Sequence, residues 1–254
     1  MADPRVIEKV LTIFDKDYAW RAIDAAPVYA AARPSPHIHF DGFLHSGLAQ
    51  EIAAAFPNNY NVGWTVHSHE HADRKFLGDE TKVDPLFRAF MQATASRQFL
   101  LFLETLTGIK GLIPDPYYIG GGAMTAGPGD KLDMHIDFNW HYKLHAHRRC
   151  NALFYLTPDW DPKWGGSLQI GRDDPVTFLP VFNRLVVFNT TENSWHGQPK
   201  PIMQGAPLRR VFSAFYYTAA SPGQIADPHL TKYHDTTPYT EKPLKEYQSC
   251  KSSM

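Results

Sequence analysis

At 254 residues, of which 43% are hydrophobic, the chain is long enough to bury a substantial core, and barrels and sandwiches of this size often form one domain. The formal net charge of −1 gives no electrostatic reason to expect nucleic acid or a membrane as a partner. No apolar run approaches the length of about 18 residues that predicts a membrane span. Two cysteines, Cys150 and Cys250, lack the paired spacing of a disulfide framework or a zinc knuckle.

The first hundred residues predict mainly helices, from their apolar spacing and from the prolines and glycines that end them. The strongest helix spans Pro85–Gly108, with a break expected near Ser96. Asn58–Asp73 is polar and is expected to be irregular, with histidines at alternate positions. The other expected elements are helices over Val6–Phe14, Tyr18–Ala32 and Gly47–Phe56, and a short strand over His37–Phe40.

From Ile109 onward the pattern changes to short strands separated by glycine and proline. Arg184–Phe188 is expected as one strand, and Arg209–Tyr217, rich in aromatic and β-branched residues, as another. This change from helices to many short strands predicts an α+β arrangement with helices packed on sheets.

The most informative motif consists of His135, Asp137 and, after a gap of 58 residues, His196. Two imidazoles and one carboxylate on one face of a metal leave three positions open, which is the ligand set of non-haem Fe(II) oxygenases. A structural zinc site would use four protein ligands, usually including cysteine. His135 and Asp137 are two residues apart, so an extended strand end directs both to the same side.

Arg209, thirteen residues after His196, adds a second indication. A guanidinium suits a carboxylate in a two-pronged hydrogen bond. Three metal ligands followed by an arginine are what binding of 2-oxoglutarate requires, because its keto acid end chelates the metal and its distal carboxylate needs a cation. Arg209 and Ser213 are four apart, so on a strand they share one face.

With these residues in place, the chain resembles the 2-oxoglutarate/Fe(II)-dependent oxygenase superfamily, and within it the prolyl-hydroxylase-like branch. The resemblance covers roughly residues 115 to 219 and is weaker over 36–56; residues 220–254 resemble nothing that we can name. The segments that carry it are Cys150–Trp160, Trp164–Ile170, Phe182–Phe188 and, more weakly, Ile38–Leu44.

The resemblance implies a double-stranded β-helix of jelly-roll, cupin-like type, supported by the N-terminal helices. We therefore expect one oxygenase domain over 1–254. Within it, residues 1–110 give helical support and a leading strand, 111–220 the jelly-roll catalytic core, and 221–254 a C-terminal tail.

The resemblance also assigns roles for 2-oxoglutarate. Arg209 is preferred to Arg210 as the cation, because the family has its cation at the first position of this run. Adjacent strand residues face opposite sides, so only one of the two can reach the pocket. Tyr155 matches a tyrosine that helps to hold the distal carboxylate, and Asn151 and Leu153 share its face. One departure is Val211, where many relatives have serine; Ser213 is expected to substitute. This group of cosubstrate residues is therefore Arg209, Tyr155, Ser213, Asn151 and Leu153.

The resulting hypothesis is a hydroxylase that uses Fe(II), 2-oxoglutarate and dioxygen, with ascorbate as a candidate reductant, and that releases succinate and carbon dioxide. Asp137 argues against a halogenase, in which a small residue replaces the carboxylate and leaves room for chloride. We expect a small-molecule substrate, no nucleic acid and no membrane. The alternatives are a protein side-chain (prolyl-type) hydroxylase, a non-catalytic jelly-roll binding protein, and a zinc hydrolase, for which no general base is evident.

Three segments are expected to contact the substrate: Asn58–Asp73, Phe138–His147 and the tail after Pro222. The cluster of His141, His145 and His147 with Arg148 and Arg149 is expected to be a solvated loop near the mouth of the barrel. The first residues lack the apolar segment of a secretion signal, so we expect a reducing, cytoplasmic setting. The sequence leaves the oligomeric state open.

Overall fold

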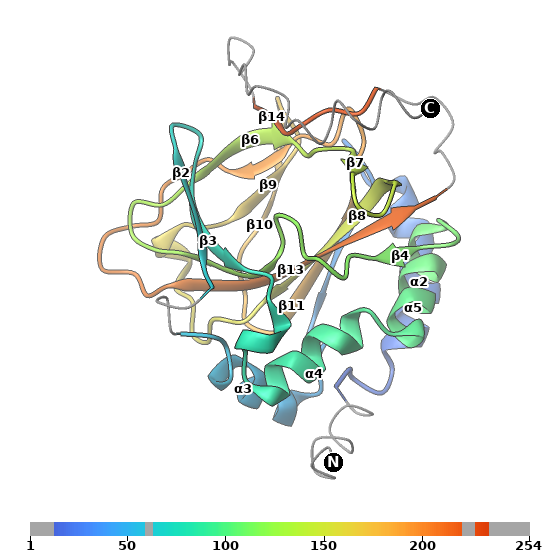
Figure 1. Cartoon of the computed structure of the whole chain (residues 1–254), viewed down its shortest axis with the longest axis horizontal. Coiled ribbons are helices and arrows are strands. Elements are labelled where there is room, and N and C mark those ends of the chain that lie inside the picture. The colour runs from blue at the N-terminus through green and yellow to red at the C-terminus, as the bar shows by residue number, and fades with distance from the viewer. Residues whose placement is uncertain (1–12, 59–62, 220–226, 234–254) are drawn as a thin grey trace.

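The computed structural model describes residues 13–58, 63–219 and 227–233. Its centre is a fourteen-stranded antiparallel sheet that curls into a nearly closed barrel, the double-stranded β-helix of a jelly roll (Figure 1). The helices gather on one side of this sheet, so the predicted α+β jelly roll is confirmed. The helices are α2 (Tyr18–Ala31), α3 (Ser46–Ala54), α4 (Pro85–Thr94) and α5 (Arg97–Thr107), with short 3-10 turns at Glu80–Lys82 and Pro162–Trp164.

The sheet has a main path of ten strands in the order β1-β11-β8-β13-β5-β3-β6-β12-β9-β10, to which β2, β4, β7 and β14 add at the sides. In chain order the strands are β1 (His37–Asp41), β2 (Thr65–His69), β3 (Ala72–Leu77), β4 (Ile113–Pro114), β5 (Gly122–Ala126), β6 (Leu132–Ile136), β7 (Trp140–His141), β8 (Ala146–Tyr155), β9 (Leu168–Ile170), β10 (Val176–Phe178), β11 (Arg184–Asn189), β12 (His196–Gln198), β13 (Arg209–Thr218) and β14 (Lys232–Tyr233).

The helices predicted over Tyr18–Ala32, Gly47–Phe56 and Pro85–Gly108 are confirmed. The break in the long helix falls at Ala95–Ser96, where the Ser96 hydroxyl accepts a hydrogen bond from the Phe99 amide and so caps α5. Gly108 then ends α5 in the left-handed conformation, with φ of 73°. The helix expected over Val6–Phe14 lies almost wholly outside the described residues.

The expectation of an irregular segment over Asn58–Asp73 is wrong for its described part. Thr65–His69 and Ala72–Leu77 form an antiparallel hairpin, β2–β3, with His67 directly opposite Arg74. Polar side chains hid the strand, because β2 is exposed along almost its whole length and neither of its faces needs apolar residues.

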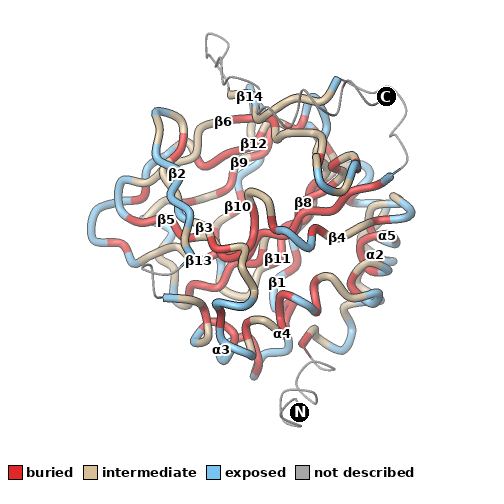
Figure 2. The backbone as a smooth tube through the Cα atoms, in the orientation of Figure 1, coloured by how far each residue is buried: buried red, intermediate tan, exposed pale blue. Residues whose placement is uncertain are grey.

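The core lies between the helices and the outer face of the sheet. Side chains on β8 and β13 alternate, and Phe154, Phe212 and Tyr216 point toward the helices, where phenylalanines of α4 and α5 meet them. Figure 2 shows these two strands buried along almost their whole length. The opposite face of the same strands turns into the barrel. In the part of the chain that the structure describes, no helix is both long and apolar enough to cross a membrane.

Replacing Phe154 by alanine should lower the free energy of unfolding by about 3–5 kcal/mol, the usual cost of emptying a buried phenylalanine site. Phe154 is 1% exposed and contacts the rings of Phe43, Phe90 and Phe99. Chemical denaturation measures the change, and Leu101→Ala on α5, where the side chain is 45% exposed, is the control. Equal effects of the two changes would contradict this account of the core.

Candidate metal and cosubstrate site

The structure brings His135, Asp137 and His196 together inside the barrel. His135 on β6 and His196 on β12 are direct partners in the strand register, and their ring centroids are 4.3 Å apart. One ligand atom from each of the three side chains lies within 4.8 Å of the others. The Asp137 carboxylate is 3.5 Å from Nε2 of His135 and 3.3 Å from Nε2 of His196.

Gly197 allows this close pairing of β12 with β6. A side chain at this position would place its Cβ 2.8 Å from the backbone carbonyl oxygens of Leu132 and Asp133. The residue after His196 therefore has to be small for the two histidines to meet.

Hydrogen bonds fix both imidazoles in the same orientation. Nδ1 of His135 donates to the Asp133 carbonyl at 2.8 Å, and Nδ1 of His196 donates to the Ser194 carbonyl at 2.8 Å. With the proton held on Nδ1, each Nε2 keeps a lone pair directed at the shared space. This second partner of a metal-binding histidine sets its tautomer.

The protonation states also suit a metal. Burial, with the neighbouring His196, lowers the pKa of His135 to about 4, so the ring is neutral at pH 7. Burial alone would raise the pKa of Asp137, but the charge of Arg148 and the adjacent imidazoles outweigh it and hold that pKa well below its usual range. Neutral imidazole and ionised carboxylate are the forms that bind a metal ion.

The chemistry of this donor set fits Fe(II). Two nitrogen ligands and one carboxylate oxygen lie on one side, and they face a cavity of about 70 Å³ rather than a fourth protein ligand. Among the described residues, this is the one group of three or more histidine, cysteine, aspartate or glutamate side chains with such spacing.

Arg148 and Asn151 both contact the Asp137 carboxylate. An Arg148 terminal nitrogen and the Asn151 amide both donate to Oδ2 of Asp137 at 2.9 Å, and Arg148 also donates to the Asn151 side-chain oxygen. The Arg148 guanidinium lies 3.5 Å from the Phe215 ring centroid and 4.5 Å from that of Phe138. The rings of Phe215 and Phe138 therefore both pack against this guanidinium.

The expectation of a solvated loop over His141–Arg149 is therefore wrong for part of that segment. Arg148 is 3% exposed, and His141 is 1% exposed and pairs with the buried Asp115 at 3.1 Å. Both lie on strands, β8 and β7. The run of charged and histidine residues concealed an alternation in which one side faces the interior.

The residues expected to bind 2-oxoglutarate line the same cavity as the metal ligands. Arg209, Tyr155, Ser213, Leu153 and Asn151 all contribute to its wall. One Arg209 nitrogen donates to the Gly166 carbonyl at 2.6 Å, whereas its buried Nε has no hydrogen-bond partner. A buried guanidinium with an unused donor is suited to an anionic ligand. Asn151 differs from the others, because its amide is already engaged by Asp137 and Arg148.

Strand alternation separates Arg209 from Arg210 as expected. Arg209 shares the cavity face of β13 with Val211 and Ser213. Arg210 points to the helical side, where it donates to the Ala53 carbonyl and lies over the Phe56 ring. Burial raises the pKa of Tyr155, so its hydroxyl stays protonated and can donate a hydrogen bond.

A second, larger cavity of about 990 Å³ opens beside the first. The inner face of the β2–β3 hairpin forms one wall, residues 116–120 another, and residues 230–233 contribute Leu230, Thr231 and Tyr233. Tyr233 stacks on His71 with centroids 4.7 Å apart and lies 5.7 Å from the His135 ring. All three segments expected to contact the substrate thus reach this cavity. The described parts of 58–73 and of the tail line it with several residues, and 138–147 lines it with Phe138.

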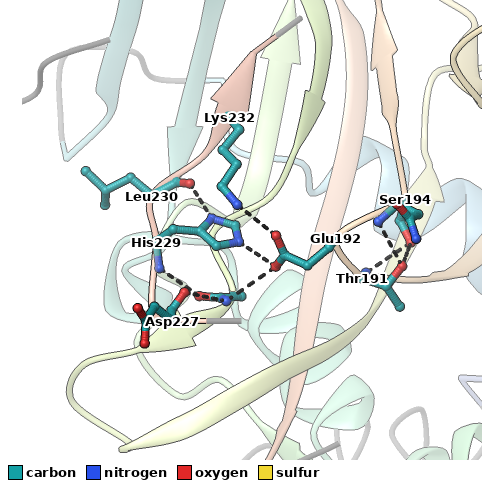
Figure 3. A network of polar contacts seen from close by, with 9 residues as sticks. Thr191, Glu192, Ser194, Asp227, His229, Leu230 and Lys232 are labelled. Carbon is teal, nitrogen blue, oxygen red and sulfur yellow. Dashed lines mark hydrogen bonds and ion pairs between the residues drawn. The ribbon is translucent and has the colours of Figure 1, made fainter. Parts of the chain in front are cut away.

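Glu192 holds the C-terminal segment in place (Figure 3). Its carboxylate pairs with His229 at 2.6 Å and with Lys232 at 2.7 Å, and β14 adds to β6 beside His135. Glu192 lies in the turn that leads from β11 to His196, and Thr191 and Ser194 hydrogen-bond within that turn. The sequence offered no signal for this contact, since it joins two distant polar segments.

Comparison with known proteins agrees with this geometry. The family model described as the 2OG-Fe(II) oxygenase superfamily matches residues 121–218, a range that contains all three candidate metal ligands and Arg209. Over these residues the chain matches the 2OG-Fe(II) oxygenase superfamily. It is therefore a 2-oxoglutarate-dependent oxygenase, and enzymes of this superfamily use Fe(II), 2-oxoglutarate and dioxygen.

Solved structures share the fold of this oxygenase at low sequence identity. A prolyl hydroxylase from Trichoplax adhaerens, in complex with a peptide fragment of hypoxia inducible factor, is 16% identical over 85% of this chain and 94% of its own, with a TM-score of 0.58. A prolyl-4-hydroxylase from Pseudomonas putida is 18% identical over 80% and 99%, with a TM-score of 0.54. HygX from Streptomyces hygroscopicus, with nickel, 2-oxoglutarate and hygromycin B bound, is 10% identical over 83% and 96%, with a TM-score of 0.54. No curated protein sequence matches the chain.

Replacing Asn151 by leucine should weaken Fe(II) binding about 10- to 100-fold, the usual effect of losing a group that orients a metal ligand. The change removes the hydrogen bond to Asp137 and the two that Asn151 accepts from Arg148, without altering the charge of the site, so it tests the orientation of the carboxylate. Anaerobic titration with Fe(II) measures the affinity. An unchanged affinity in a variant that still melts cooperatively would show that Arg148 suffices to orient the carboxylate.

Proposed function

We propose that this oxygenase hydroxylates an unactivated C–H bond of a small molecule, an amino acid or another metabolite, and releases succinate and carbon dioxide. His135, Asp137 and His196 would hold Fe(II). Bound iron supplies activation of dioxygen coupled to oxidative decarboxylation of 2-oxoglutarate. The observation that carries the proposal is the three-ligand set facing a cavity that also contains the buried, incompletely bonded guanidinium of Arg209.

The residues that line the smaller cavity would have separate roles in binding and positioning. Arg209 and the Tyr155 hydroxyl bind the distal carboxylate of 2-oxoglutarate, while Ser213 and Leu153 shape the cavity around its carbon chain. Asn151, by its contacts, positions Asp137 instead. Phe188 and Leu168 complete an apolar wall that limits water at the metal.

Support for a small-molecule substrate comes from the larger cavity. Its size lies within the range for small-molecule sites, near the upper end, and its walls come from three separate segments. We also propose a reducing, cytoplasmic setting, which is supported by the free, fully buried Cys150 and by the oxygen-sensitive ferrous ion.

Alanine at His135, Asp137 or His196 should abolish succinate formation and also the weak visible band expected when Fe(II) and 2-oxoglutarate are added without oxygen. Each change removes one of three metal ligands. His39→Ala is the matched control, because this imidazole is on the surface at β1, away from the cavity. Full activity of His196→Ala with added Fe(II) would refute the metal assignment. A substrate screen by succinate release should include prolyl peptides, since stimulation by peptides alone would favour the side-chain alternative.

Arg209→Ala should weaken 2-oxoglutarate binding at least about tenfold, or roughly 1.4 kcal/mol, because the distal carboxylate loses its cation. Tyr155→Phe should cost less, about 1 kcal/mol for one neutral hydrogen bond. The measurement is anaerobic titration of the Fe(II)-loaded protein with 2-oxoglutarate. Arg210→Ala, on the opposite face of β13, is the control; an effect of Arg210→Ala alone would reverse the assignment of the two faces.

A further inference from the structure

Arg74 is a third arginine at the site, and neither the metal set nor the cosubstrate set uses it. It lies on β3 directly opposite His67 of β2, so the two residues share the inner face of the hairpin. Thr65, His67, Arg74 and Phe76, alternate residues of the two strands, all line the larger cavity. Arg74 also lines the smaller cavity that contains the metal ligands. It therefore stands where the two cavities meet.

The Arg74 guanidinium lacks a protein partner of its own. Its Nε is fully buried without a hydrogen bond, and among the described residues its side chain makes neither a hydrogen bond nor an ion pair. Arg148 is paired with Asp137, and Arg209 donates to the Gly166 carbonyl. Burial lowers the pKa of Arg74, so the surroundings disfavour its charge. A half-buried, unpaired cation whose Nε is shielded from water is suited to an anionic ligand.

Charge counting shows that the expected small ligands do not supply this partner. Fe(II) is a dication and 2-oxoglutarate a dianion, so together they leave the charge of the cavity unchanged. The charged groups that line it are Arg74, Lys131, Arg148 and Arg209 on one side and Asp73 and Asp137 on the other. Lys131 is paired with Asp133, Arg148 with Asp137, and Arg209 faces the distal carboxylate. Asp73 accepts a hydrogen bond from Ser68 and forms no ion pair with Arg74 among the described residues. With Asp133 included, four cationic side chains face three carboxylates, so one positive charge is left over.

We propose that Arg74 binds a carboxylate or phosphate group of the substrate to be oxidised, so that the substrate is an acidic small molecule. This inference rests on the proposed function. The anionic group would occupy the junction of the two cavities, and the rest of the molecule would lie against the aromatic walls of the larger one. Those walls include Phe76, Phe138 and Tyr233. A guanidinium fork matches either oxyanion in geometry.

Binding of model compounds tests this without turnover. The protein is loaded with Ni(II) and 2-oxoglutarate, and isothermal titration measures the affinities of 3-phenylpropanoate, phenyl phosphate and the neutral 3-phenylpropanamide. At least one anion should bind about tenfold more tightly than the amide, or roughly 1.4 kcal/mol. The affinities of 3-phenylpropanoate and phenyl phosphate, compared with each other, show which of the two oxyanions binds more tightly. Failure of metal or 2-oxoglutarate to bind would contradict the proposed function and not this inference. In that case the same titrations on metal-free protein still measure the preference for the anion.

Arg74→Gln should remove the preference for the anion while it leaves 2-oxoglutarate affinity within about twofold, and Arg74→Lys should retain part of the preference. Lys75→Gln is the matched control: it removes the same charge from the next residue of β3, which is exposed and lines neither cavity. No anion preference in the wild-type protein would overturn the proposal. A tenfold loss of 2-oxoglutarate affinity in Arg74→Gln would also overturn it, because Arg74 would then belong to the cosubstrate site.

Discussion

The two-residue alternation of β8 and β13 is the constraint on which the whole site depends. One face of this strand pair carries Phe154, Phe212 and Tyr216 into the helices, and packing of these rings fixes the strands in depth and register. The direction of the side chains on the other face is then fixed as well, and Tyr155, Arg209 and Ser213 point into the barrel. A shift of one residue would exchange the two faces and place Arg210 in the cavity. Hydrophobic burial on one side therefore sets the chemistry on the other.

The electrostatics of the interior follow from that placement. Arg74, Arg148 and Arg209 line the cavity that contains the candidate metal ligand Asp137. Such a concentration of positive charge is costly away from water unless each cation meets a partner. Arg148 meets Asp137, and its guanidinium is also covered by two aromatic rings. The remaining two arginines form no ion pair among the described residues, which is the basis for proposing anionic ligands for both.

Sequence alone predicted the parts of the site that depend on local pattern. His135 and Asp137 are two residues apart on one strand end, so spacing was sufficient to direct both to one side. The family resemblance supplied Tyr155, the choice of Arg209 over Arg210, and the jelly roll. The sequence did not reveal Arg148, because it lies in a run of histidines and arginines that resembles a surface loop. Arg74 was missed for a related reason: the polar hairpin that carries it showed no apolar period. Contacts such as Tyr233 on His71 join segments more than a hundred residues apart, and no local pattern encodes them.

The Glu192 contacts tie the two ends of the site together mechanically. Glu192 precedes the candidate ligand His196 by four residues. Its carboxylate pairs with His229 and Lys232, in the segment that places Tyr233 over His71 and beside His135. Figure 3 shows this carboxylate between the turn that carries Thr191 and Ser194 and the segment that carries His229 and Lys232. The contacts of one side chain thus place a wall of the outer cavity beside the turn that leads to His196.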